Sequence, residues 1–227
     1  MALVRFLRGR CEWDAAQTPR SLIPYMLEEA HEVAEAVVDE DDEELAAELG
    51  DLLLHLAFQL VLAEEREAFS PEEVAERVIE KMRRRHPHIY GDDAAAEEWE
   101  ALKDRERKAA GRSVLEGLAR GLDPLSRAHR IQERVGAIGF DWANARDAFE
   151  KVGEEVEEVR RALGFESSTE LEAELGDLLF SVVNLTRLAG THALHALQRA
   201  NRKFTRRFEA LERLAADRGV DLREASL

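Results

Sequence analysis

The chain has 227 residues, of which 48 are acidic and 32 basic, and its formal net charge is −16. Such a charge argues against a nucleic-acid polymer as a partner, because phosphates are repelled unless basic side chains gather on one surface. A small anion can still bind if a divalent cation lies between it and the carboxylates.

Residue types also indicate the compartment. Cys11 is the only cysteine, which excludes an internal disulfide and suits a reducing environment. The first ten residues are interrupted by Arg5, Arg8 and Arg10 and do not resemble a signal peptide. The sequence has no continuous apolar run of about 18 residues of the kind that spans a bilayer. We therefore expect a cytoplasmic protein with no membrane partner.

The first 90 residues predict a series of helices. Pro24 suits the first turn of a helix that continues through the acidic stretch 27–33. A third helix is expected to begin at Ser70-Pro71, where Ser70 can cap it, and to end at His86-Pro87-His88. The helix between these two has apolar residues at the spacing of one helical face, at Leu49, Leu52, Leu53, Leu56 and Leu60.

Residues 91–124 differ from what precedes them. They are acidic and alanine-rich from Asp92 to Glu100, and then contain Gly111, Gly117, Gly121 and Asp123-Pro124. Glycine and proline at this density interrupt regular structure. We interpret this segment as a partly helical linker.

Residues 125–227 repeat the first half. The segment 47–53 recurs without change as 173–179, and Glu28-Glu29 is matched by Glu154-Glu155 at the same offset of 126 residues. No segment alternates between apolar and polar residues in the manner of a strand. The sequence therefore predicts an all-α protein of two tandem helical bundles, residues 1–90 and 125–227, joined by the linker.

Acidic residues gather on one face of two helices in each half. In the second half, Glu154, Glu155 and Glu158 fall within about 100° of helical arc, and the next helix places Glu174 and Asp177 one turn apart. If the two helices pack antiparallel, these carboxylates meet at a common point. The first half offers the same arrangement with Glu28, Glu29, Glu32, Glu48 and Asp51.

Crowded carboxylates raise one another's pKa unless a cation lies between them. Mg²⁺ is the best match, because it prefers hard oxygen ligands and keeps several waters. A solvated acidic face would explain one such motif, since glutamate-rich helices are common. It does not explain two motifs that recur at the same separation, so we expect metal binding.

Basic residues supply a second requirement for binding a phosphate ester. Lys203, Arg206 and Arg207 share one face of a helix and can hold phosphate oxygens in charge-assisted hydrogen bonds. By themselves they would form an exposed basic patch, but together with a carboxylate group they are candidates for binding a triphosphate. The same spacing occurs in the first half, at Lys81, Arg84 and Arg85.

These motifs resemble the MazG family of all-α nucleoside triphosphate pyrophosphohydrolases, in which Glu-Glu-x-x-Glu is followed by Glu-x-x-Asp. The resemblance covers nearly the whole chain, including the tandem arrangement of two MazG-like domains. Further matching segments are Trp13-Asp14, Arg84-Arg85-His86-Pro87-His88, Gly139-Phe140-Asp141-Trp142, and Asn201 with Lys203-Phe204 and Arg206-Arg207.

The resemblance implies hydrolysis of NTPs and dNTPs to the monophosphate and pyrophosphate by a homodimer. It implies that Mg²⁺, for which Mn²⁺ could substitute, is bound in the second half by Glu155, Glu158, Glu174 and Asp177. If the first half keeps its own metal site, the ligands there are Glu29, Glu32, Glu48 and Asp51. The nucleotide would be contacted by Lys151, Glu154, Asn201, Lys203, Arg206 and Arg207.

Catalysis would use the same second-half acids, Glu154, Glu155, Glu158, Glu174 and Asp177. The bound metal would lower the pKa of an attacking water, and Glu154 is the candidate acceptor of its proton. Two other functions compete with this one: a nucleotide-sensing module without turnover, and a structural helical scaffold. The second half keeps every carboxylate and basic position of the core motif, which favours catalysis.

Three further features leave alternatives open. Glu170 stands where some relatives carry a lysine near the nucleotide. Trp13 and Trp142 precede the acidic helices and are candidates either for the core or for stacking on a base. The pair Glu28 and His31 resembles half of a di-iron motif, but the second half has Glu157 where that motif needs histidine.

Overall fold

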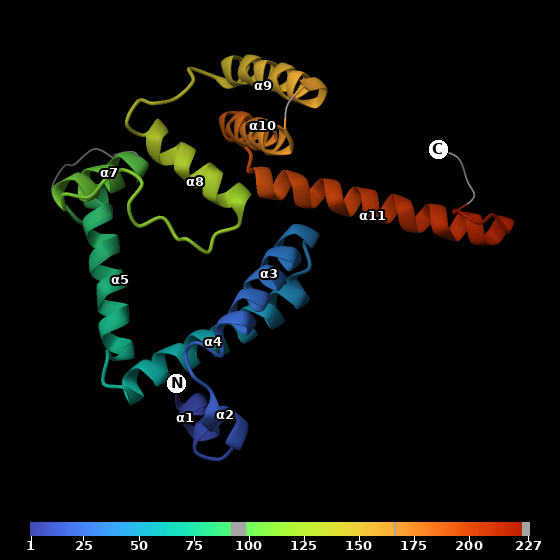
Figure 1. Ribbon diagram of the computed structural model, residues 1–227. Helices are drawn as coiled ribbons and strands as arrows, with labels where there is room; N and C mark the ends of the chain where they lie inside the picture. Colours follow the sequence, from blue (N-terminus) through green and yellow to red (C-terminus); the bar gives the residue numbers. More distant parts are fainter. Residues whose placement is uncertain (92–98, 166, 224–227) are drawn as a thin grey trace. The chain divides into compact units, whose positions relative to one another are not determined.

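The computed structural model describes residues 1–91, 99–165 and 167–223 (Figure 1). All regular structure in these ranges is helical and no strand occurs there, which confirms the all-α prediction. Contacts divide the chain into two compact units, Met1–Ala96 (unit 1) and Glu97–Leu227 (unit 2). Each unit is built around one long helical hairpin.

In unit 1, the hairpin consists of α3 and α4, which lie side by side (Figure 1). Pro24 lies in the first turn of α3, as the sequence indicates. The turn is short because Glu40 adopts a left-handed backbone conformation and Asp41 caps α4 by accepting from two backbone N–H groups. The helices of this unit are α1 (Ala2–Arg8), α2 (Glu12–Ala16), α3 (Ile23–Asp39), α4 (Asp42–Glu65), α5 (Pro71–Arg85) and α6 (Pro87–Tyr90).

The core of unit 1 lies where α1 crosses the C-terminal half of α4. The ion pairs Arg5–Glu64 (2.6 Å) and Arg8–Glu65 (2.7 Å) join the same two helices at the surface. Helix α4 is long and apolar enough to cross a membrane by length and composition alone. Core helices of soluble proteins often have the same length and composition. The buried core residues are Val4, Leu22, Ala57, Phe58, Val61 and Leu62.

In unit 2, the hairpin consists of α9 and α10, which again lie side by side (Figure 1). Ser167 and Glu170 form a reciprocal capping box that starts α10, so Glu170 has a local structural role. Helix α8 packs on α10 and on α11, and α11 then runs away from the other helices of the unit. The helices are α7 (Trp99–Ala109), α8 (Pro124–Gly136), α9 (Ala145–Phe165), α10 (Ser168–Leu188) and α11 (Ala193–Arg218).

Part of the segment interpreted as a linker belongs to unit 2. Helix α7 contacts α8, and Arg130 of α8 pairs with Glu100 of α7 at 3.4 Å. Arg134 of α8 donates hydrogen bonds to the carbonyl oxygens of Val114 and Glu116. The segment therefore packs against the second hairpin's supporting helix. Its acidic, alanine-rich start, residues 92–98, lies outside the described residues.

Both hairpins leave large apolar side chains exposed. Leu53 of α4 is 65% exposed, and Leu179, at the equivalent position of α10, is 59% exposed. Exposed apolar side chains therefore occur at equivalent positions of both hairpins. Further exposed residues on the hairpin helices are Leu49, Leu56, Val156, Phe149, Leu163, Leu175 and Phe180.

Candidate active site

The hairpin of unit 2 brings three carboxylates together. Glu155 and Glu158, one turn apart on α9, face Glu174 on α10, and one oxygen of each lies within 4.8 Å of the other two. The Glu155 side chain is buried, whereas Glu158 and Glu174 are half-buried. The predicted meeting of the two acidic motifs is therefore present. We call Glu155, Glu158 and Glu174 the second acidic group.

A lysine one turn before the second acidic group partly neutralises it. The Lys151 ammonium lies 2.7 Å from a Glu155 oxygen and 3.2 Å from a Glu154 oxygen. These two contacts raise the pKa of Lys151, so it stays charged at neutral pH. Arg161 pairs with Glu158 at 3.3 Å on the exposed side. The excess of carboxylates over neighbouring cations is the donor set that suits a divalent metal ion.

Unit 1 contains an equivalent group, the first acidic group, formed by Glu29, Glu48 and Asp51. One oxygen of each again lies within 4.8 Å of the others. Burial, together with the charges of Glu32, Glu44 and Glu29, raises the pKa of Glu48 to about 7. Partial desolvation and the charges of Glu29 and Glu28 likewise raise the pKa of Glu32, although this side chain is largely exposed. Both shifts come from desolvation and from the crowding of neighbouring carboxylates.

The two acidic groups differ in their companions. The position of Lys151 is taken in unit 1 by Tyr25, and that of Ser181 by His55. The Tyr25 and His55 rings are stacked with centroids 6.0 Å apart, and His55 Nε2 lies 3.6 Å from a Glu29 oxygen. Trp13 adds an edge-on contact to Tyr25. An aromatic cluster therefore replaces the ammonium beside the first acidic group.

Not every predicted site residue joins these groups. Glu32 of α3 and Asp177 of α10 are exposed and lie outside the two closest sets of oxygens. Asn201, Lys203, Arg206 and Arg207 lie exposed on α11, and none of them belongs to either acidic group. None of the ion pairs described for the chain involves Lys203 or Arg207.

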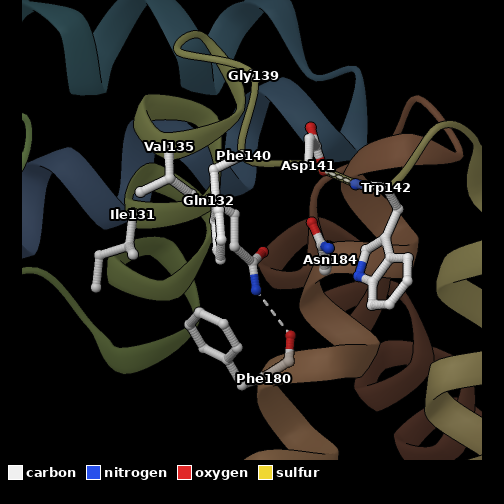
Figure 2. Close-up of a pocket in the computed structure, with 9 residues that line it drawn as sticks. All are labelled: Ile131, Gln132, Val135, Gly139, Phe140, Asp141, Trp142, Phe180 and Asn184. Atoms are coloured by element: carbon white, nitrogen blue, oxygen red, sulfur yellow. Dashed lines mark hydrogen bonds between the residues drawn. The ribbon is translucent and has the colours of Figure 1, made fainter.

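Unit 2 also has a cavity of about 450 Å³ that sequence reasoning did not single out (Figure 2). It lies between α8, the loop that follows it, and α10. The signal that could have revealed it is the spacing of Phe180 and Asn184, which lie one turn apart on one face of α10. Its lining residues are Ile131, Gln132, Val135, Gly139, Phe140, Asp141, Trp142, Phe180 and Asn184.

These features define a class of all-helical protein in which a helical hairpin gathers carboxylates suited to a divalent cation. The chain belongs to the MazG family: the model of the MazG nucleotide pyrophosphohydrolase domain matches residues 17–90 and 146–211. The two matched segments contain the two acidic groups, so each acidic hairpin lies in its own copy of the domain.

Similar proteins carry related names. The chain is 41% identical to the nucleoside triphosphate pyrophosphohydrolase of Escherichia coli K12, covering 98% of this chain and 88% of that protein. It is also 41% identical to the nucleoside triphosphate pyrophosphohydrolase/pyrophosphatase MazG of Thermotoga maritima, covering 94% and 84%. The nucleoside triphosphate pyrophosphohydrolase of Mycolicibacterium smegmatis is 33% identical, covering 62% of this chain and 46% of that protein.

Proposed function

We propose that the chain hydrolyses nucleoside and deoxynucleoside triphosphates between the α and β phosphates, which releases the monophosphate and pyrophosphate. The observation that carries this proposal is the second acidic group, which lies beside Lys151 in a domain of the MazG nucleotide pyrophosphohydrolase family. The names of the most similar proteins support hydrolysis of nucleoside triphosphates. The position of the cleaved bond is our inference.

The donor set supports Mg²⁺ as the cofactor, with Mn²⁺ as a substitute. Glu155, Glu158 and Glu174 would hold it, and Asp177, one turn further along α10, is close enough in sequence to complete the set. When bound there, such an ion neutralises phosphate charge and lowers the pKa of a water molecule. Glu29, Glu32, Glu48 and Asp51 are the corresponding ligands proposed for unit 1.

The remaining groups of the second half have separable tasks. Glu154 is largely exposed and is held by Lys151 at 3.2 Å, so its carboxylate can meet solvent and accept a proton from an attacking water. Lys151 itself fixes Glu155 through an i, i+4 contact. Asn201, Lys203, Arg206 and Arg207 would bind phosphate oxygens.

We also propose that the protein is a homodimer in the cytoplasm. The exposed apolar faces of the hairpins need a cover, and a second copy offers the same faces. Gly176 supports close packing there: it lies in mid-helix on α10, where glycine is unfavourable, and open space surrounds the position of its missing Cβ. The net charge of −16 supports a small-molecule substrate rather than a nucleic-acid polymer.

The test is pyrophosphate release from a panel of NTPs and dNTPs, with Mg²⁺ and with EDTA. The intact chain is compared with Glu155→Ala and with Glu29→Ala, which are equivalent positions of the two copies. We expect metal-dependent release that falls by about 10³-fold in Glu155→Ala, because one ligand of the metal is lost. Survival in Glu29→Ala would assign turnover to unit 2 and leave unit 1 another task.

One result would overturn the hydrolase proposal. If the intact chain releases no pyrophosphate from any nucleotide with either Mg²⁺ or Mn²⁺, hydrolysis is excluded. Binding of a triphosphate without turnover would then favour the nucleotide-sensing function. Absence of both binding and turnover would leave the helical scaffold.

A further inference from the structure

The cavity of unit 2 is lined mostly by apolar side chains. Ile131 and Val135 of α8 form an aliphatic side, and the rings of Phe140, Trp142 and Phe180 border it (Figure 2). All three rings are exposed, with Trp142 at 45% and Phe180 at 43%. Exposed aromatic rings around an apolar hollow of this volume suit a flat ligand that stacks on them.

One polar atom in the cavity has no partner. Gln132 is 3% exposed, and its Nε2 donates to the carbonyl oxygen of Phe180 at 2.8 Å. That bond fixes which amide atom is which, because a carbonyl oxygen accepts only from the NH₂ group. The Oε1 atom is buried and accepts no hydrogen bond from the described residues. Figure 2 shows this oxygen turned away from Phe180. A buried acceptor of this kind is completed by a ligand that donates an N–H.

The loop that carries Trp142 is held in place. Both oxygens of Asp141 accept from Arg187 of α10, at 2.6 and 2.7 Å, and one of them also accepts from the Trp142 N–H. Gly136 permits this approach, since a Cβ there would lie 2.6 Å from an Asp141 oxygen. The backbone N–H of Trp142 is therefore tied to α10 through Asp141, whose two oxygens contact the same Arg187 nitrogen, and this fixes the loop that carries the indole before any ligand arrives.

The cavity lies at a suitable distance from the second acidic group. Phe180 follows Glu174 by six residues on α10, which is about 9 Å along the helix axis. Six residues also correspond to a rotation of about 120° around the helix axis, so Glu174 and Phe180 lie on different faces of α10. In a nucleotide, a ribose separates the base from the α phosphate. The ribose and phosphates of a nucleotide can bridge this offset, so a base in the cavity can direct its phosphates around α10 toward the carboxylates.

We propose that this cavity binds the nucleobase of a nucleotide, with the base stacked on Trp142 and Phe180 and with an N–H of the base donated to Gln132 Oε1. This inference rests on the proposed function for the choice of a nucleotide over other flat heterocycles. It adds a base subsite, which the acidic groups and the basic residues of α11 do not provide.

The test compares two ligands that differ only in the base. A nucleoside monophosphate and ribose 5-phosphate are titrated calorimetrically into the full chain, with Mg²⁺ and again with EDTA. We expect the monophosphate to bind at least ten-fold more tightly than ribose 5-phosphate. Trp142→Ala should reduce this difference about ten-fold, and Gln132→Leu about five-fold. Neither variant should change the affinity for ribose 5-phosphate.

Two further variants control the experiment. Trp142→Phe keeps a ring and should retain most of the difference, whereas Trp99→Ala removes an exposed tryptophan outside the cavity and should change nothing. Circular dichroism checks that each variant is folded. Equal affinity for the two ligands, no binding of either, or a difference that survives Trp142→Ala would overturn the base subsite.

This outcome is separable from failure of the hydrolase proposal. The titration needs no turnover, so base binding can be present in a chain that releases no pyrophosphate. If turnover is found, the same substitutions should raise KM for NTPs about ten-fold and leave kcat within two-fold, because the cavity lies away from the bond that breaks. Loss of kcat with unchanged KM would contradict the subsite.

Discussion

Glu48 has a strongly raised pKa within the first acidic group. Its pKa of about 7 in the folded protein lies above the ordinary value of 4.5, so the folded chain binds this proton more tightly than the unfolded chain does. The contribution of Glu48 to stability is therefore greatest below about pH 4.5 and is lost as pH rises toward 7. In EDTA, Glu48→Gln should raise the melting temperature near pH 7.5 and leave it almost unchanged near pH 5.

The control for this prediction is Glu80→Gln on α5, an exposed glutamate outside the acidic group. Its substitution should have little effect on the melting temperature. With excess Mg²⁺ at neutral pH the intact chain should melt at a higher temperature than Glu48→Gln. The reason is that the intact carboxylate gains a ligand that the amide cannot bind as well. An effect of Glu48→Gln that is the same at both pH values would contradict the pKa argument.

At the scale of single residues, the sequence predicts which acids converge but not which stay outside. Periodicity places Glu155, Glu158 and Asp177 on suitable helical faces, and only the packing of α9 on α10 decides that Asp177 is left exposed. Gln132 has no motif, and its meaning comes from its burial and its single hydrogen bond to Phe180. Such information depends on contacts between residues distant in sequence.

Helix caps hold the acidic hairpins in register at the scale of elements. In the capping box of α10, Ser167 Oγ accepts from the Glu170 N–H, and a Glu170 oxygen accepts from the Ser167 N–H at 2.8 Å. We expect Ser167→Ala to lower the free energy of unfolding of unit 2 by about 1 kcal/mol. Chemical denaturation followed by circular dichroism measures this change, and Ser168→Ala, one residue on, should have little effect.

Local signals predict elements better than their partners. Pro24 and Ser70-Pro71 mark helix starts that the structure confirms, because proline and capping residues act within one turn. Helix α7 shows the opposite case. Its packing against α8 depends on Arg130 reaching Glu100, 30 residues away, which no local pattern indicates. The segment interpreted as a linker, residues 91–124, therefore includes a helix of unit 2.

At the scale of the whole molecule, each unit leaves large apolar side chains exposed to solvent. Leu53 and Leu179 occupy equivalent positions of α4 and α10, and both are more than half exposed. Beyond its first turns, α11 also presents Phe204, Phe208 and Leu211 to solvent. Burying a leucine side chain contributes about 2 kcal/mol of free energy. In a symmetric interface between two copies of a hairpin, each such leucine is buried in both copies and makes this contribution twice.

Equivalent exposed leucines on the two hairpins allow a dimer interface to be located by substitution. If the second hairpin forms the dimer, Leu179→Glu introduces two carboxylates at the interface and should produce monomers, measured by light scattering coupled to size-exclusion chromatography. Leu53→Glu tests the equivalent face of unit 1, and Leu115→Glu, an exposed leucine outside both hairpins, is the control. Because each variant adds the same charge at an exposed leucine, a change confined to Leu179→Glu locates the interface on α10. A monomeric intact chain would exclude the homodimer, and pyrophosphate release would then have to come from a single copy.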